Sequence, residues 1–155
     1  MRVPGRLERI WCKRARRGPM DARESARLVA GRGLEGSADQ GGRRQISVLV
    51  REDWDAALAG LGAAVDPSAR RANLLVSGVS LAGSRGSVLA VGGCRLRVLG
   101  ELTPCERMDE TLPGLEDALR IAGRGGVFAE VIAGGEVRVG DPVVLEAEEP
   151  PDQEP

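Results

Sequence analysis

The chain has 155 residues, a length that suits one domain with its own core, and its 42% hydrophobic and 29% charged residues are ordinary for a globular protein. The absence of histidine excludes serine–histidine triads, histidine zinc sites and imidazole acid–base catalysis, and the three cysteines lack the spacing of a structural zinc site or a disulfide framework. A net charge of −1 and 2% aromatic residues argue against nucleic-acid binding, and without an apolar run of roughly 18 residues or a secretory signal we expect a cytoplasmic protein with no membrane partner.

The first half of the chain predicts short strands separated by polar and glycine-rich turns. Strands are predicted over residues 7–14, 27–30 and 45–50, with a polar turn at 16–20 and a glycine-rich loop at 31–42. The acidic opening at Glu52 and the helical spacing after it predict an amphipathic helix that ends near Gly62. Asp66-Pro67 predicts a further short turn or helix.

The second half of the chain predicts two hairpins and one more helix. Strands are predicted over residues 73–79, 87–91, 94–99, 127–132, 136–139 and 143–145, with hairpin turns at 92–93 and 133–135 and a helix over 115–121. Many short strands with few helices indicate a mainly β (α+β) fold, a β-barrel with a few peripheral helices. We assign residues 1–146 to one domain and expect 147–155 to be a disordered acidic tail.

The most informative motif is a predicted helix start built around Cys105. Thr103 suits the N-cap, Pro104 suits the first helical position, and Glu106 completes a capping box. Free backbone N–H groups in the first turn would favour the thiolate of Cys105, and Arg107 would add a full charge. Such a sulfur can ligate a soft metal, carry a persulfide or attack an electrophile. The alternative is a small buried residue at an ordinary helix start.

Two other clusters would complete an anion site. Residues 70–73 place two guanidinium groups and the Asn73 amide at the start of a strand, and Arg32 lies in a glycine-rich loop whose N–H groups can cradle an anion. An anionic, metal-bearing ligand would use both clusters and the thiol. Each cluster also has a plain interpretation, with Asn73 as a turn residue, Arg71 as a solvated charge and the loop as a connection without dinucleotide or P-loop spacing.

Together these motifs resemble those of the MOSC domains, named after the C-terminal domain of molybdenum-cofactor sulfurases. The resemblance covers most of the chain and is most specific at Thr103-Pro104-Cys105-Glu106. The other matching segments are residues 33–36, 43–45, 71–79 and 135–143. One loop departs from the family, because many relatives have aspartate directly after the glycine equivalent to Gly36 and frequently histidine two residues later. This chain has Ser37 and Asp39 there, and Asp39 is a candidate for a shifted substitute.

The resemblance implies involvement with the molybdenum cofactor, a phosphorylated pterin whose dithiolene holds molybdenum. In relatives that hold this cofactor, the cysteine at the position of Cys105 ligates the metal, and some of them reduce N-hydroxylated compounds. Other members are thought to carry sulfur on that cysteine. The resemblance also implies contacts of Arg71 and Asn73 with the pterin or its phosphate and a hydrogen bond of Asp109 near the metal. The expected cofactor-binding residues are Arg32, Arg71, Asn73, Thr103, Arg107 and Asp109.

The leading hypothesis is therefore a MOSC domain that binds the molybdenum cofactor, with Cys105 as catalytic residue, either a molybdenum ligand or a sulfur carrier. Its expected partners are the anionic pterin and a cysteine desulfurase or a redox protein. Two alternatives stay open: a molybdenum-dependent reductase of N-hydroxylated compounds, and a non-catalytic interaction module. Cys12 and Cys94 lie in predicted strands, and we interpret them as packing residues.

Overall fold

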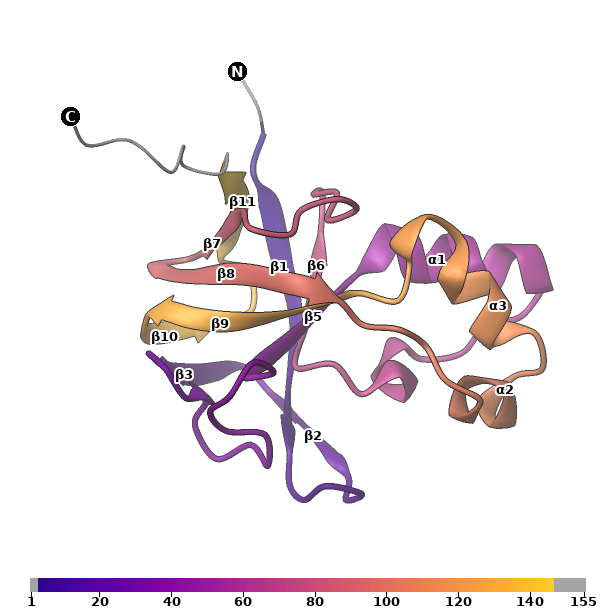
Figure 1. Ribbon diagram of the computed structural model, residues 1–155, viewed down its shortest axis with the longest axis horizontal. Coiled ribbons are helices and arrows are strands. Elements are labelled where there is room, and N and C mark those ends of the chain that lie inside the picture. The colour runs from indigo at the N-terminus through magenta and orange to yellow at the C-terminus, as the bar shows by residue number, and fades with distance from the viewer. Residues whose placement is uncertain (1–2, 147–155) are drawn as a thin grey trace.

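Seven strands close into a β-barrel in the computed structural model, which describes residues 3–146 (Figure 1). They are β1 (Gly5–Lys13), β5 (Ile46–Val50), β6 (Leu74–Ser77), β7 (Val88–Val91), β8 (Cys94–Glu101), β9 (Val127–Ala133) and β11 (Pro142–Glu146). Around the barrel the order is β11-β7-β8-β9-β5-β6-β1, and a short pairing of β1 with β11 at Gly5↔Val143 and Arg6↔Pro142 closes it. Only the β5–β6 pair is parallel among these pairings. The predicted mainly β barrel with peripheral helices is confirmed.

The barrel interior is filled by aliphatic side chains, because successive residues of a strand point to opposite faces. In β8, Cys94, Leu96 and Val98 are at most 1% exposed, and the residues between them are more accessible. Leucine and valine dominate this core. Cys12 and Cys94 are both buried in it, as predicted for packing residues.

A second, three-stranded sheet lies beside the barrel and corrects one prediction. It consists of β3 (Ser25–Val29), β4 (Gly33–Leu34) and β10 (Gly135–Arg138), in the order β10-β3-β4. The predicted hairpin between residues 127–132 and 136–139 is wrong, because β10 pairs with β3 and not with β9. Gly134 packs so closely against the Leu28 carbonyl that a Cβ would collide with it, and Gly135 has φ 147°. These glycines let the chain leave the barrel and enter the other sheet.

Three short helices cover one side of the barrel, on the right of Figure 1. They are α1 (Arg51–Leu61), α2 (Arg107–Thr111) and α3 (Leu115–Arg120). Helix α1 ends at Gly62, which has φ 64° and the left-handed conformation common at helix C-termini. A second core joins the helices to the barrel wall and contains Trp11, Trp54 and Met108. Within residues 3–146, no helix has the length and apolarity needed to cross a membrane.

Most other elements agree with the sequence predictions. The predicted β7–β8 hairpin is present, with Val91 paired to Cys94, and Asp66-Pro67 opens the short 3-10 helix η1 (Pro67–Arg70). A strand that was not predicted, β2 (Met20–Arg23), pairs with β1 and extends the sheet beyond the barrel. The proposed tail at residues 147–155 lies outside the described residues.

Candidate functional site

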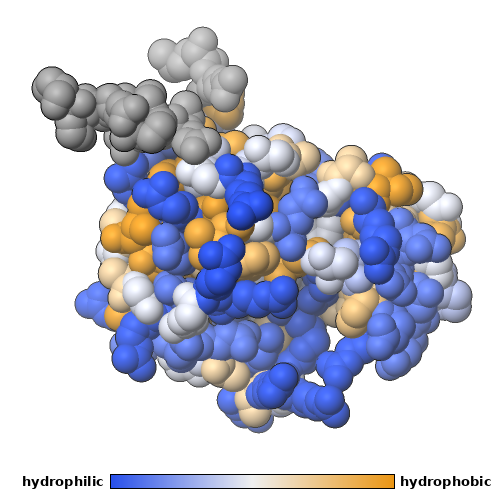
Figure 2. Space-filling view, viewed as in Figure 1, coloured by the Kyte–Doolittle hydropathy of each residue, from blue (hydrophilic) through white to orange (hydrophobic). Residues whose placement is uncertain are grey.

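A cleft of about 690 Å³ opens at the end of the barrel where β1 and β8 finish and β5, β6 and β9 begin. Four segments distant in sequence supply its walls: the β1–β2 turn, the loop before β5, η1 with the start of β6, and the loop that carries Cys105 together with α2. In Figure 1 the β1–β2 hairpin and α2 lie at the lower edge of the molecule. Figure 2 shows that this edge is strongly hydrophilic.

Cys105 lines the cleft and is exposed, in contrast to the two buried cysteines. The predicted capping box around it is wrong. Helix α2 begins at Arg107, its N-cap is Glu106, and no side chain caps it. The Cys105 carbonyl accepts the Met108 N–H at 2.9 Å, so this cysteine lies in the turn before the helix. Its sulfur therefore gains its accessibility from a loop and not from a place in the first helical turn.

Contacts with a neighbouring loop explain this late helix start. The Leu102 N–H donates to the Gly126 carbonyl at 2.8 Å. The Arg70 guanidinium donates to the carbonyls of Leu102 at 3.1 Å and Gly125 at 2.9 Å. These bonds hold the chain before Cys105 against the segment before β9, where it cannot adopt helical geometry. A capping box is a pattern of four neighbouring residues, so it gives no information about hydrogen bonds to residues more than 20 positions away.

Arg70 connects the cysteine loop to the rest of the cleft. Burial lowers the pKa of its guanidinium, the negative charge of the nearby Cys105 when ionised acts in the opposite direction, and the positive charge of Arg44 lowers the pKa further. Arg44 in turn lies over the ring of Phe128, with 5.0 Å from its guanidinium carbon to the ring centroid. Arg70 thus combines a structural role with a positive charge next to the exposed sulfur.

Arg71 has two unusual properties. Its backbone adopts the left-handed conformation, with φ 64°, at the end of η1. Its Nη2 atom is buried and has no hydrogen-bond partner within the described part of the chain. A positive φ is uncommon for a residue with a side chain, and an unsatisfied buried N–H group is costly. Arg71 therefore lines the cleft with a guanidinium group that the described part of the chain does not fully satisfy.

Asn73 lines the cleft but uses its amide to hold the site together. Its Oδ1 accepts from the Ser47 N–H at 3.0 Å and from the Ser47 hydroxyl at 3.2 Å. Its Nδ2 donates to the Trp11 carbonyl at 3.3 Å and to the Ser37 hydroxyl at 3.4 Å. Ser37 is buried and also accepts from the Lys13 N–H. In this loop Ser37 therefore supports the architecture, while Asp39 forms an ion pair with Lys13 at 2.8 Å.

Positive charge is concentrated in the cleft although the whole chain has a net charge of −1. Its lining contains seven basic residues and two acidic ones, Asp39 and Glu110. The basic residues are Lys13, Arg16, Arg17, Arg44, Arg70, Arg71 and Arg107. An excess of guanidinium groups over carboxylates is the property expected of an anion-binding site.

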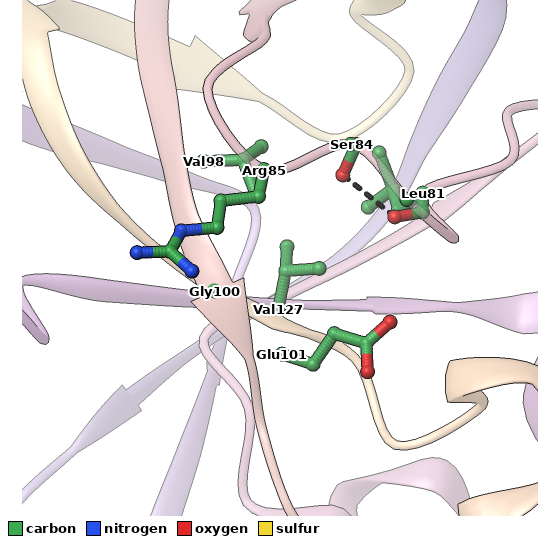
Figure 3. Close-up of a pocket in the computed structure, with 8 residues that line it drawn as sticks. Leu81, Ser84, Arg85, Val98, Gly100, Glu101 and Val127 are labelled. Carbon is green, nitrogen blue, oxygen red and sulfur yellow. Dashed lines mark hydrogen bonds between the residues drawn. The ribbon is translucent and has the colours of Figure 1, made fainter.

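A smaller cavity of about 270 Å³ lies between the end of β8 and the loop that precedes β7 (Figure 3). The Ser84 hydroxyl in its wall donates to the Leu81 carbonyl at 2.6 Å. Figure 3 shows the charged ends of Arg85 and Glu101 pointing away from one another. The polar groups of this cavity do not converge, whereas those of the large cleft do.

The sequence matches the MOSC domain profile over residues 35–144. The chain belongs to the MOSC domain family. The matched segment includes Arg71, Asn73, Thr103, Cys105 and Arg107, all of which line the cleft. No curated protein matches this MOSC domain closely enough to count as a relative.

Solved structures share the fold of this MOSC domain. The YuaD protein from Bacillus subtilis is 22% identical, with a TM-score of 0.78, and the match covers 96% of this chain and 99% of that one. YiiM from Geobacillus stearothermophilus is 18% identical, with a TM-score of 0.74 and coverage of 93% and 76%. YiiM from Escherichia coli is 20% identical, with a TM-score of 0.68 and coverage of 96% and 71%. At these identities the likeness concerns the fold.

Two residues predicted for the cofactor site of this MOSC domain lie elsewhere. Arg32 is exposed in the β3–β4 turn and is not among the residues that line the cleft. Asp109 also lies outside the lining, and its Oδ1 accepts the Glu116 N–H at 2.9 Å near the start of α3. The cleft residues that the sequence did not single out include Arg16 and Arg17, which lie in the polar turn predicted at residues 16–20. The sequence predicted the turn but not its place beside the cleft.

Proposed function

We propose that this MOSC domain binds the molybdenum cofactor in the cleft, with Cys105 as the metal ligand or as a sulfur carrier. One observation carries the proposal: an exposed cysteine and the unpartnered buried Nη2 of Arg71 line the same basic cleft. A ligand that combines a soft metal with an anionic group fits this pair.

The residues present suit such a cofactor. Arg71 and Arg107 provide guanidinium groups for the phosphate of the pterin, and Arg44 with Phe128 provides a flat surface for its ring. When bound, the cofactor supplies a molybdenum ion that can exchange electron pairs. Across residues 3–146, no group of three histidine, cysteine, aspartate or glutamate side chains could hold a metal ion. A single thiolate, in contrast, suits a metal that arrives with its own dithiolene ligands.

The other cleft residues position these groups. Arg70 fixes the loop before Cys105 through the Leu102 carbonyl and keeps a positive charge beside the sulfur. Asn73 joins β6 to Ser47 and to the Ser37 loop, which places Arg71 at the mouth of the barrel. Their contribution is to hold the thiol and the guanidinium in one orientation before a ligand arrives.

Sulfur transfer is the second candidate role. The observation that favours it is the exposure of Cys105 on a loop, where a partner protein could reach the sulfur. In that role its thiolate attacks the outer sulfur of a persulfide on a cysteine desulfurase, and the thiolate of the desulfurase leaves. The product is a persulfide on Cys105. A fully loaded molybdenum form would also be tested as a reductase of N-hydroxylated compounds.

The test is the molybdenum content of wild type, Cys105→Ser and Cys94→Ala after each is mixed anaerobically with isolated cofactor and desalted. Cys94→Ala is the matched control, since Cys94 is a buried cysteine outside the cleft. We expect near-stoichiometric metal on wild type and the control, and none on Cys105→Ser. Equal loading of Cys105→Ser would refute the ligand role. If none of the three proteins holds metal, sulfur transfer becomes the remaining role. Mass spectrometry of the protein after reaction with a desulfurase would then show whether Cys105 carries a persulfide.

A further inference from the structure

The only lysine of the chain, Lys13, lies in the wall of the cleft with a carboxylate already bound to it. Its Nζ atom donates to Oδ2 of Asp39 at 2.8 Å, and Asp39 also lines the cleft. Within residues 3–146, no other basic residue of the cleft lining forms an ion pair. One cation of the cleft is therefore covered by the protein itself.

The backbone around Asp39 holds its carboxylate next to Lys13. The Ala38 N–H donates to the Lys13 carbonyl at 2.8 Å, on one side of Asp39. On the other side, the Gln40 side chain donates to the Leu34 carbonyl at 2.7 Å. These bonds fix the chain before and after Asp39, so the carboxylate stays within reach of the lysine.

The two partners of this ion pair differ in exposure. The Lys13 side chain is 17% exposed, whereas the Asp39 side chain is 44% exposed. Rotation of the Asp39 side chain would therefore move its carboxylate into solvent and leave the Lys13 ammonium in the cleft wall. An ion pair with one accessible partner contributes little to stability, and lysine binds phosphate as well as carboxylate. An anionic ligand can thus replace the carboxylate without disturbing the fold.

We propose that Asp39 is an internal counterion, which competes with the anionic group of a ligand for Lys13. As long as its carboxylate occupies the lysine, the affinity of the cleft for every anion that uses Lys13 is reduced by the fraction of molecules in the paired state. The inference rests on the proposed function in one respect, the binding of an anion in this cleft. It requires neither molybdenum nor Cys105.

Calorimetric titration of the cofactor-free protein with inorganic phosphate tests the proposal. We expect Asp39→Asn to bind phosphate about fivefold more tightly than wild type at low salt. The matched control is Glu110→Gln, which removes the same charge from the same cleft. Glu110 is exposed and belongs to no ion pair within residues 3–146, so its replacement should change the affinity by less than about twofold.

A double-mutant cycle shows whether the effect of Asp39 passes through Lys13. In a Lys13→Gln background, Asp39→Asn should change phosphate affinity no more than Glu110→Gln does in wild type. Because the chain has no other lysine, acylation of the ε-amine, followed by peptide mass spectrometry, reports on Lys13 alone. Phosphate should protect Lys13 from acylation at a lower concentration in Asp39→Asn than in wild type.

Equal phosphate affinity of Asp39→Asn and wild type, including undetectable binding by both, would overturn the proposal. Weaker binding by Asp39→Asn would also overturn it, since Asp39 would then help to bind the anion. An equal gain in Glu110→Gln, or a gain that persists without Lys13, would assign the effect to general electrostatics and not to competition. Circular dichroism melting curves of all variants check that each one is folded. Failure of the cofactor proposal is read separately, as absence of molybdenum from wild type.

Discussion

Arg71 is the residue whose conformation is hardest to explain by stability alone. It has a positive φ, a buried Nη2 without a partner, and no acidic neighbour among the described ion pairs. Both features cost free energy in the absence of a ligand. Strain of this kind is found at binding sites, where the surrounding structure holds a residue in place for a ligand.

Replacing Arg71 by glycine should separate stability from binding. We expect Arg71→Gly to raise the free energy of unfolding by about 1 kcal/mol, because glycine adopts the left-handed region without strain. The same change should weaken cofactor binding by about 1.5–3 kcal/mol through loss of a charge-assisted hydrogen bond. Urea unfolding and cofactor titration measure the two effects.

Ala122 supplies the control for this experiment. It is exposed and also has a positive φ, 50°, but it lies outside the cleft. Ala122→Gly should stabilise the protein by a similar amount and leave cofactor binding unchanged. A destabilised Arg71→Gly variant with wild-type affinity would show that the guanidinium serves the fold and not a ligand.

At the scale of elements, η1 places Arg70 and Arg71, and Asp66 fixes its start. The Asp66 carboxylate accepts the Ser68 N–H at 3.0 Å and a hydrogen bond from Arg9 at 3.0 Å. These hydrogen bonds lower the pKa of Asp66 from 3.8 to about 2. The bond from Ser68 has the largest effect, and the bond from Arg9 the next largest. The folded protein therefore favours the ionised form of this side chain.

The stability of the protein should depend on this carboxylate in acid. A lowered pKa in the folded state stabilises the protein above pH 4, and this contribution disappears as the pH falls towards 2. Because the Asp66 side chain is 54% exposed, we expect only about 1 kcal/mol. The free energies of unfolding of wild type and Asp66→Asn, measured with urea, should differ by this amount at pH 5 and become equal near pH 2. A difference that stays constant with pH would contradict the assignment.

Elements defined by local patterns were predictable, and elements defined by distant contacts were not. Helix α1 and the β7–β8 hairpin follow from spacing and turn residues within a dozen positions. The start of α2 was placed too early because Arg70 and Gly126 hold the preceding residues. The glycine turn at residues 133–135 predicted a β9–β10 hairpin, but β10 pairs with β3, which lies more than 100 positions earlier in the chain.

At the scale of the whole molecule, the cleft depends on a close approach between the Cys105 loop and the segment before β9. Gly125 is buried there, and a Cβ on it would lie 2.6 Å from the Leu102 carbonyl oxygen and 3.3 Å from Pro104. We expect Gly125→Ala to lower the free energy of unfolding by about 1–3 kcal/mol and to reduce molybdenum loading by displacing the loop.

Gly60 in α1 is the matched control, since a Cβ there meets nothing within 4 Å. Gly60→Ala should raise the free energy of unfolding by about 0.5–1 kcal/mol and leave loading unchanged. Chemical unfolding of both variants checks that the free energy of unfolding falls for Gly125→Ala and rises for Gly60→Ala. If Gly125→Ala were as stable as wild type, the loop would have room to move, and the close approach would not define the site.

The residues that line the cleft were predictable only in part. Cys105, Arg71, Asn73, Thr103 and Arg107 belong to two short motifs that the sequence singled out, and all five line the cleft. The arginines of the β1–β2 turn enter the same cleft only because β1 pairs with β6 and so carries the turn past the end of the barrel. The pairing of β1 with β6 cannot be predicted from residue spacing or composition.

The separation into two cores has a spectroscopic consequence. Both tryptophans, Trp11 and Trp54, belong to the core beneath the helices, the chain has no tyrosine, and its single phenylalanine, Phe128, lines the cleft. The interior of the barrel therefore contains no aromatic chromophore. Tryptophan emission therefore reports on the contact between the helices and the barrel wall, through Trp54 of α1 and Trp11 of β1, and not on the packing inside the barrel. If the helices detach before the barrel melts, fluorescence should change before the strand signal in far-ultraviolet circular dichroism, whereas coincident curves would show that the two cores unfold together.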